Sequence, residues 1–330
     1  MNEELLKLEN LNIDYKVKGG ALSAVHNVNL SIHRGEIFAV VGESGCGKTT
    51  VAHSIMNLLA GNNARIEGKI LFEGKDLRTC SKKEMEQIRG QEIGMIFQNP
   101  LDSLNPVYTT GKQVQEAIML DHVEKNEAWE KAIRLFQDVR MPDAKERVNS
   151  YPHELSGGMR ERVMIAMMLS RNPKLLIADE PTTALDVTIE AQILEILQEL
   201  KKERNTAIML ITHNFGLVAE VADRIAVMYA GEVIETGDVY EIFENPMHPY
   251  TRLLMQALPR KTKKEGRLQT IEGSVPRILE KKPECRFANR CPYATERCSR
   301  ETPAKIKVSE THAYRCFLTK GQEVQLWRQW

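Results

Sequence analysis

The sequence has no excess of charge of either sign and no long apolar run. Its 330 residues include 45 basic and 45 acidic side chains. This balance disfavours a protein that binds nucleic acid through a general positive field, although a local basic patch remains possible. No apolar stretch reaches the length of about 18 residues that predicts a membrane-spanning helix. Because Met1 to Glu4 have neither the basic nor the apolar part of a secretory signal, we expect a cytoplasmic chain.

The closely spaced cysteine pairs that usually bind zinc are also missing. Four of the six cysteines follow the spacing C-x5-C-x6-C-x17-C near the C-terminus. Structural disulfides are rare in a reducing compartment, and four thiols in a short segment without an apolar run suggest a metal that holds the segment together. Widely spaced thiolates can bind an iron–sulfur cluster, with zinc or free thiols as the alternatives. The four cysteines are Cys285, Cys291, Cys298 and Cys316.

The segment from Gly42 to Thr50 fits the pattern G-x-x-x-x-G-K-[ST] at every fixed position. A strand-length apolar run precedes it, and apolar residues recur at helical spacing after it. In such a unit the backbone N–H groups face phosphate oxygens, Lys48 neutralises phosphate charge and Thr49 offers a hydroxyl to Mg²⁺. We expect Cys46, inside the loop, to be exposed to alkylation. The predicted nucleotide-binding residues are Gly42, Glu43, Ser44, Gly45, Cys46, Gly47, Lys48, Thr49 and Thr50.

Polar side chains follow three further predicted strands. Gln98 follows one strand, Asp179 and Glu180 follow the next, and His213 follows the third. In a sheet that carries a phosphate loop, we expect Asp179 to hold Mg²⁺ through water and Glu180 to polarise the attacking water. A lone glutamine or histidine is more often structural. Gln98 and His213 become candidates for contacts to Mg²⁺, water or the γ-phosphate because they share one sheet edge with Asp179.

A charged, helix-forming segment at residues 111–149 is predicted to be an inserted helical subdomain. The run Leu-Ser-Gly-Gly follows it. Ser156 is a good N-cap for the next helix, and Gly157 and Gly158 leave that helix end without side chains. Such a helix end binds anions. Because the chain already has a phosphate loop, we expect this end to meet the nucleotide held by another subunit.

Shorter patterns outline the rest of the chain. Residues 5–8 and 25–32 have the partly alternating character of strands. Tyr15 is expected in a polar loop between them, either stacked on a nucleotide base or simply packed at the surface. Residues 225–236 predict a hairpin with an Ala-Gly turn. The basic stretch at residues 260–282 is interpreted first as a solvated linker and second as a surface for a partner.

In this order the motifs resemble those of the ATP-binding subunits of ABC transporters, over residues 4–245. The set comprises the phosphate loop, the Gln98 loop, the Leu-Ser-Gly-Gly signature, the acid pair, the Ala-Leu-Asp loop and the later histidine. The runs Ser-Gly-Gly-Met-Arg and His-Pro-Tyr are similar to the oligopeptide, dipeptide and nickel importer branch. Glu161 stands where that branch usually has glutamine, and Asn214 where aspartate usually follows the histidine.

The resemblance implies an α/β fold with a RecA-like P-loop ATPase core, an antiparallel β subdomain and a helical insert at about residues 98–165. It places an ABC-type ATP-binding domain at residues 1–245 and a small metal-cluster extension at residues 246–330. Members of this branch carry a terminal cysteine set with a [4Fe–4S] cluster, and zinc is the alternative. The resemblance implies that the catalytic residues are Glu180, His213 and Gln98. It also implies that Mg²⁺ is held by Thr49, Gln98 and Asp179, and that Tyr15 contacts the base of the nucleotide.

The resemblance further implies a head-to-tail dimer in which one subunit contacts the ATP of the other through Ser156, Gly157, Gly158 and Asp186. The second ATP-binding subunit is often a different chain. Two permease subunits and an extracytoplasmic binding protein complete such importers, with the ATPase at the cytoplasmic face of the membrane and no nucleic acid. The expected function is ATP hydrolysis that drives import of small peptides, or of nickel or an oligosaccharide. The alternative is a soluble ABC-type ATPase that acts on nucleic acid or ribosomes.

Overall fold

The computed structural model describes residues 3–59, 61, 63–98, 103–182, 187–257 and 271–318. The chain divides into two compact units. The first consists of Met1–Leu5, Ile32–Ile37 and Thr79–Ile211, and the second of Leu6–Ser31, Phe38–Arg78 and Thr212–Trp330. The phosphate loop and the cysteine-bearing segment thus belong to the same unit. The predicted domain boundary at residue 245 is not tested by this division and stays a prediction.

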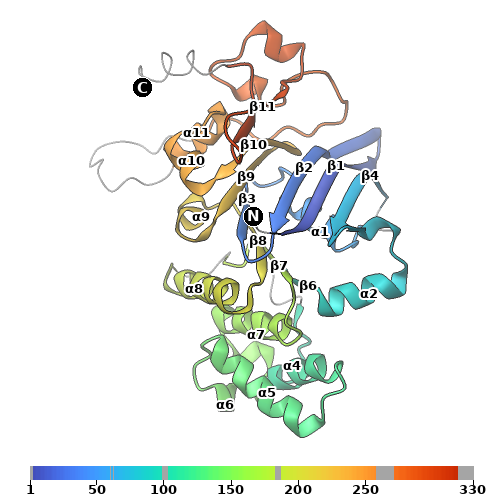
Figure 1. Ribbon diagram of the computed structural model, residues 1–330, viewed down its shortest axis with the longest axis vertical. Coiled ribbons are helices and arrows are strands. Elements are labelled where there is room, and N and C mark those ends of the chain that lie inside the picture. The colour runs from blue at the N-terminus through green and yellow to red at the C-terminus, as the bar shows by residue number, and fades with distance from the viewer. Residues whose placement is uncertain are drawn as a thin grey trace, which may run out of the picture. The chain divides into compact units, whose positions relative to one another are not determined.

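Three parallel strands form the centre of the first unit (Figure 1). β7 (Leu175–Asp179) lies between β6 (Ile93–Ile96) and β8 (Ala207–Thr212). Every residue of the three strands is buried, which is why their sequences are continuous apolar runs instead of alternating ones. The predicted polar site residues begin where the apolar runs of β6 and β7 end.

The predicted helical insert is present in the first unit. Helices α4 and α5 pack against each other and against α7. Of the expected buried residues, Val114, Ile118 and Phe136 are buried, whereas Ile133 is only half-buried because its neighbour Ala132 faces the core instead. The helices of this unit are α2 (Lys82–Gln91), α4 (Thr110–Met119), α5 (Lys125–Asp138), α6 (Ala144–Arg147), the 3₁₀ helix η2 (Pro152–Glu154), α7 (Gly157–Leu169) and α8 (Val187–Arg204).

A four-stranded sheet in the order β2-β1-β4-β5 forms part of the second unit (Figure 1). β1 continues well beyond the predicted strand because its second half pairs with β4, where Tyr15 stands opposite Ala64. The prediction that Tyr15 lies in a loop is therefore wrong. The strands are β1 (Glu4–Val17), β2 (Gly20–His33), β4 (Ala64–Phe72) and β5 (Lys75–Asp76), followed by the 3₁₀ helix η1 (Leu77–Thr79).

The second unit also contains a set of strands in the order β11-β12-β10-β9-β3. β3 (Ile37–Val41) is parallel to β9 (Arg224–Tyr229), and β9 is antiparallel to β10 (Glu232–Asp238). The predicted hairpin between β9 and β10 is confirmed. Its two turn residues, Ala230 and Gly231, have φ of 44° and 86°, as a tight two-residue hairpin turn requires. The helices of this unit are α1 (Lys48–Ile55), α9 (Phe215–Val221), α10 (Val239–Glu244) and α11 (Pro249–Gln256).

The C-terminal segment contributes strands to this same set. β12 (Ala313–Arg315) pairs antiparallel with β10 and with β11 (Lys305–Lys307). Two 3₁₀ helices, η3 (Ala288–Arg290) and η4 (Glu296–Ser299), precede these strands. Strands of three residues are too short to produce a periodic pattern, so none was predicted here. Within the described ranges, no helix has the length and apolar character needed to cross a bilayer.

Candidate active site

The phosphate loop connects β3 to α1 and is shaped by glycines. A Cβ atom at Gly42 would lie 2.3 Å from the Met228 carbonyl oxygen, and one at Gly47 would lie 2.6 Å from the Ala24 carbonyl oxygen. Gly47 also has φ of 103° at the start of α1, a conformation that side chains disfavour. The loop can therefore take this path only with glycine at these two positions.

Lys48 is the first residue of α1, and its side chain turns back into the loop. The Nζ atom donates hydrogen bonds to the carbonyl oxygens of Gly42 at 2.8 Å and Glu43 at 3.2 Å. The Lys48 side chain is buried, whereas Ser44 and Gly45 are exposed. The loop thus carries a fixed positive charge beneath an open rim, which is the arrangement expected for a site that receives phosphate groups.

Cys46 is fully buried inside the loop, so the expectation that it is exposed to alkylation is wrong. Its carbonyl oxygen accepts a hydrogen bond of 2.8 Å from the Gly231 N–H in the β9–β10 turn. Burial raises the pKa of the Cys46 thiol, which lowers its reactivity because the thiolate is the nucleophile. The bond to Gly231 comes from a distant part of the sequence, and the local pattern around Cys46 does not reveal such a contact.

Gln98 and Glu180, both in the first unit, are brought together. The Gln98 Nε2 atom donates a hydrogen bond of 2.9 Å to the Glu180 carboxylate. Asp179 is buried as the last residue of β7, and the Glu180 N–H donates to the Ile211 carbonyl oxygen at 2.9 Å. Glu180 has φ of 49°, a left-handed conformation that is uncommon for residues other than glycine. The backbone thus turns sharply just where the two predicted acids stand.

His213 is exposed immediately after β8 and belongs to the second unit. Its neighbour Asn214 is the N-cap of α9, because its side-chain oxygen accepts from Gly216 N–H at 3.0 Å and Leu217 N–H at 3.4 Å. Asparagine and aspartate are equally good N-caps. The departure from the aspartate usual in the branch therefore leaves this helix end intact.

Ser156 is confirmed as the N-cap of α7, where its hydroxyl oxygen accepts a hydrogen bond of 3.3 Å from the Met159 N–H. Ser156 is exposed, but Gly158 is buried. A Cβ atom at Gly158 would lie 2.5 Å from the Ile189 side chain in α8. Gly158 is thus required for helix packing as well as for a bare helix end. Asp186 lies outside the described residues.

The comparisons with known proteins cover nearly the whole chain. The model of the ABC transporter family matches residues 25–183, and that of the oligopeptide/dipeptide transporter C-terminal region matches residues 234–298. The dipeptide transport ATP-binding protein DppD of Bacillus subtilis is 45% identical, over 96% of this chain and 95% of that protein. The oligopeptide transport ATP-binding protein OppD of the same organism is 48% identical, over 95% of this chain and 88% of that protein.

The chain belongs to the ATP-binding subunits of ABC transporters, in the oligopeptide and dipeptide branch. A solved dimeric ATP-binding cassette in a post-hydrolysis state, bound to ADP and phosphate, matches with a TM-score of 0.65 and 28% identity. The match covers 71% of this chain and 99% of that cassette. The predicted family and the fold of an ABC ATPase are thereby confirmed.

The four late cysteines of this ABC subunit lie within one folded segment, and none forms a disulfide. The Cys285 N–H donates to the Cys298 carbonyl oxygen at 2.8 Å. Burial, with smaller effects from neighbouring cysteines, raises the pKa of both Cys285 and Cys291 to about 12. However, no three His, Cys, Asp or Glu side chains of the described residues are placed to hold a metal ion. Cysteine thiols are suitable ligands for zinc or an iron–sulfur cluster. However, the described thiols are not arranged as a metal site, so the structure does not support the predicted cluster.

Glu161, in the first half of α7, is a buried acid whose environment the sequence did not reveal. Its side chain is buried, and among the described residues its Oε1 atom has no hydrogen-bond partner. Burial raises the pKa of Glu161 to about 8, so the carboxyl is largely neutral near pH 7. Glutamine, which is usual at this position of the branch, would fill the same space without this ionisation.

Proposed function

We propose that this chain is the ATP-hydrolysing subunit of an importer of small peptides. The glycine-shaped loop that holds the Lys48 amine is the observation that carries the ATPase assignment. The peptide class is supported by the family match at residues 234–298 and by relatives named for dipeptide and oligopeptide transport. Nickel and oligosaccharides are the alternative transported substrates that membership of this branch leaves open.

In this proposal the loop from Gly42 to Thr50 binds the phosphates of ATP, with Tyr15 near the base. Thr49, Gln98 and Asp179 supply the hydroxyl, amide and carboxylate oxygens that Mg²⁺ prefers as ligands. When bound, Mg²⁺ neutralises charge that develops on the transferred phosphoryl group. Glu180 accepts a proton from the attacking water. The contact between Gln98 and Glu180 supports this assignment because it joins a proposed metal ligand to the proposed base.

Replacement of Glu180 tests the catalytic role. Glu180→Gln should retain ATP binding but lower turnover by at least about 100-fold, because a positioned general base contributes that much or more. The matched control is Glu130→Gln, an exposed acid on α5. Retention of normal turnover by Glu180→Gln, with an unchanged control, would remove Glu180 from the mechanism.

We further propose that Ser156, Gly157, Gly158 and Asp186 contact the nucleotide bound by a second ATP-binding subunit. The exposed, capped N-terminus of α7 supports this role because such ends stabilise anions. His213 would contact the γ-phosphate. In a dimer of one mutant and one normal subunit, Ser156→Ala should weaken hydrolysis at the partner's site. Equal loss at both sites, or no loss at either, would contradict an effect in trans.

The proposed partners are a second, homologous ATP-binding subunit, two permease subunits and an extracytoplasmic binding protein, at the cytoplasmic face of the membrane. Purification of this chain from membranes, followed by identification of attached proteins, tests the proposal. Co-purified permeases would support it. Recovery with ribosomes or nucleic acid instead would favour the alternative of a soluble ABC-type ATPase, which no relative named above supports.

We also propose a metal group at the C-terminal cysteines, with a [4Fe–4S] cluster as the first candidate and zinc as the second. The support is the donor type alone, four cysteines within one segment of the sequence, since thiolates bind both groups. Protein purified without oxygen should show broad visible absorbance together with iron and sulfide. A colourless protein with one zinc per chain would exclude the cluster, and a metal-free protein would exclude both.

A further inference from the structure

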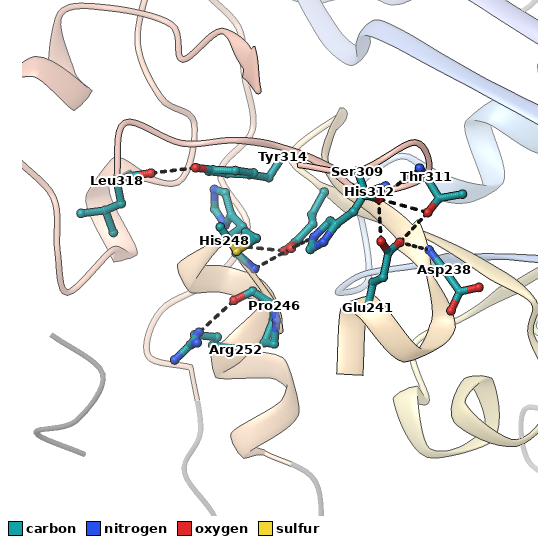
Figure 2. A network of polar contacts seen from close by, with 12 residues as sticks. Asp238, Glu241, Pro246, His248, Arg252, Ser309, Thr311, His312, Tyr314 and Leu318 are labelled. Carbon is teal, nitrogen blue, oxygen red and sulfur yellow. Dashed lines mark hydrogen bonds and ion pairs between the residues drawn. The ribbon is translucent and has the colours of Figure 1, made fainter. Parts of the chain in front are cut away.

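The C-terminal extension is fixed to the strand β10 by a buried carboxylate. Glu235 accepts hydrogen bonds from the N–H groups of Met247 at 2.6 Å and His248 at 3.0 Å, and contacts His312 Nε2 at 2.8 Å. Glu235 and His312 are both buried. On the neighbouring helix, Glu241 accepts hydrogen bonds from the hydroxyl groups of the 309–311 turn (Figure 2). The extension is thus attached both to β10, through Glu235, and to α10, through Glu241.

An aromatic cluster continues this attachment toward the phosphate loop. Phe287, which lies between Cys285 and Cys291, is buried. Its ring meets those of Tyr229 and Tyr250 edge-on, with centroids 5.0 Å and 5.3 Å apart. These are favourable distances for aromatic pairs. The segment between the first two cysteines of the set is therefore packed against β9 and α11 instead of projecting into solvent.

Arg290, at the end of the same segment, reaches the phosphate loop itself. Its two terminal nitrogens donate to the two carboxylate oxygens of Glu43 at 2.7 Å and 3.0 Å. The Nε atom donates to the Glu272 carbonyl oxygen at 2.8 Å, and the guanidinium lies over the Tyr229 ring. The Arg290 side chain is only 7% exposed. A two-pronged, largely buried pair of this kind has both fixed geometry and strength.

Glu43 is the second residue of the phosphate loop, and each of its polar groups has a partner. Its N–H donates to the Tyr250 hydroxyl at 3.0 Å, and its carbonyl oxygen accepts from Lys48 Nζ at 3.2 Å and Cys46 N–H at 3.3 Å. One residue therefore links the guanidinium of the extension to the lysine that neutralises phosphate charge. Without Arg290, the Glu43 carboxylate would be an uncompensated negative charge in a loop that binds anions.

We propose that Arg290 is a positioning residue for the phosphate loop, which makes the cysteine-bearing extension part of the ATP site. Arg290 acts through Glu43: it neutralises the carboxylate, draws it away from the phosphates and fixes the loop backbone on which Lys48 rests. The Tyr250 hydroxyl, on α11, fixes the backbone of Glu43 by accepting the hydrogen bond from its N–H. The simple alternative is that Arg290 only attaches the extension and has no effect on nucleotide binding.

Equilibrium binding of MgATP to the full-length chain tests this role. Arg290→Ala should raise the Kd for MgATP about tenfold, the effect expected when a charge-assisted pair is lost. Arg290→Lys should give an intermediate value because it keeps the charge but not the two-pronged geometry. The matched control is Arg300→Ala in the same extension, since Arg300 is exposed and pairs only loosely with Glu296 at 3.7 Å. Arg300→Ala should leave the Kd for MgATP unchanged.

A double-mutant cycle separates positioning from attachment. In a Glu43→Gln background, Arg290→Ala should change the Kd for MgATP by less than about threefold, because the residue through which it acts is already altered. A full tenfold effect in that background would overturn the proposal, as would a Kd for Arg290→Ala equal to that of the Arg300 control. If Arg290→Ala does not fold, the Lys variant and its cycle with Glu43→Gln decide between the same outcomes.

Discussion

Glu161→Gln is expected to remove a pH dependence of folding stability. The folded-state pKa of Glu161 is raised by burial from 4.5 to about 8. Between these values the folded chain holds the Glu161 proton while the unfolded chain releases it, so the contribution of this group to stability is present at low pH and is lost as pH rises. The Gln variant has no proton to lose at this position.

The size of the effect follows from linkage. One pKa unit corresponds to about 1.4 kcal/mol. Raising the pH from about 5.5 to about 7.5 should therefore cost the normal chain roughly 2–3 kcal/mol of unfolding free energy through this group, because both pH values lie above its unfolded pKa and below its folded pKa. The same change should have no such effect through position 161 in the variant.

The assay is urea unfolding of both proteins at the two pH values. His26 and His248, whose pKa values burial lowers to about 4, change stability in the opposite direction. Because they are present in both proteins, their effect cancels when the variant is compared with the normal chain. Glu130→Gln serves as an exposed control. Equal pH slopes for the normal chain and Glu161→Gln would refute the assignment of a neutral, buried carboxyl.

Two further predictions concern packing around the loop and the signature helix. Gly158→Ala should lower the free energy of unfolding by about 1–3 kcal/mol, because the new Cβ atom would lie 2.5 Å from the Ile189 side chain. Adding Ile189→Ala should restore part of this loss. A Gly158→Ala protein as stable as the normal chain would contradict the close approach. Cys46 should react with iodoacetamide much more slowly than the partly exposed Cys80 in the folded chain, because Cys46 is fully buried, and at a similar rate in urea. Mass spectrometry that finds Cys46 modified first would contradict its burial.

Local sequence patterns were sufficient where neighbouring residues decide the structure. The phosphate loop, the Ala-Gly hairpin turn and the Ser156 cap all depend on residues within a few positions of one another, and the structure has each of them. The buried strands β6, β7 and β8 were visible as apolar runs for the same reason. Asp179 and Glu180 could then be placed at the end of a strand, where the structure has them as the last residue of β7 and the residue after it.

Features that depend on distant residues could not be predicted in this way. Tyr15 lies in a strand because β4, about fifty positions later, pairs with it. Cys46 is fully buried, and its carbonyl oxygen accepts a hydrogen bond from the N–H of the distant Gly231. The pair between Arg290 and Glu43 joins residues 247 positions apart, and no local pattern links the two partners. Proximity of this kind is a property of the folded chain.

The central claim is that ATP hydrolysis by this chain drives peptide uptake. The most direct measurement is entry of a labelled dipeptide or short oligopeptide into membrane vesicles that contain the whole importer, with this subunit either normal or Glu180→Gln. The account predicts ATP-dependent uptake with the normal subunit and a fall of at least about 100-fold with the variant, although the variant still binds ATP. Equal uptake by both, or no peptide uptake by the intact importer, would contradict it.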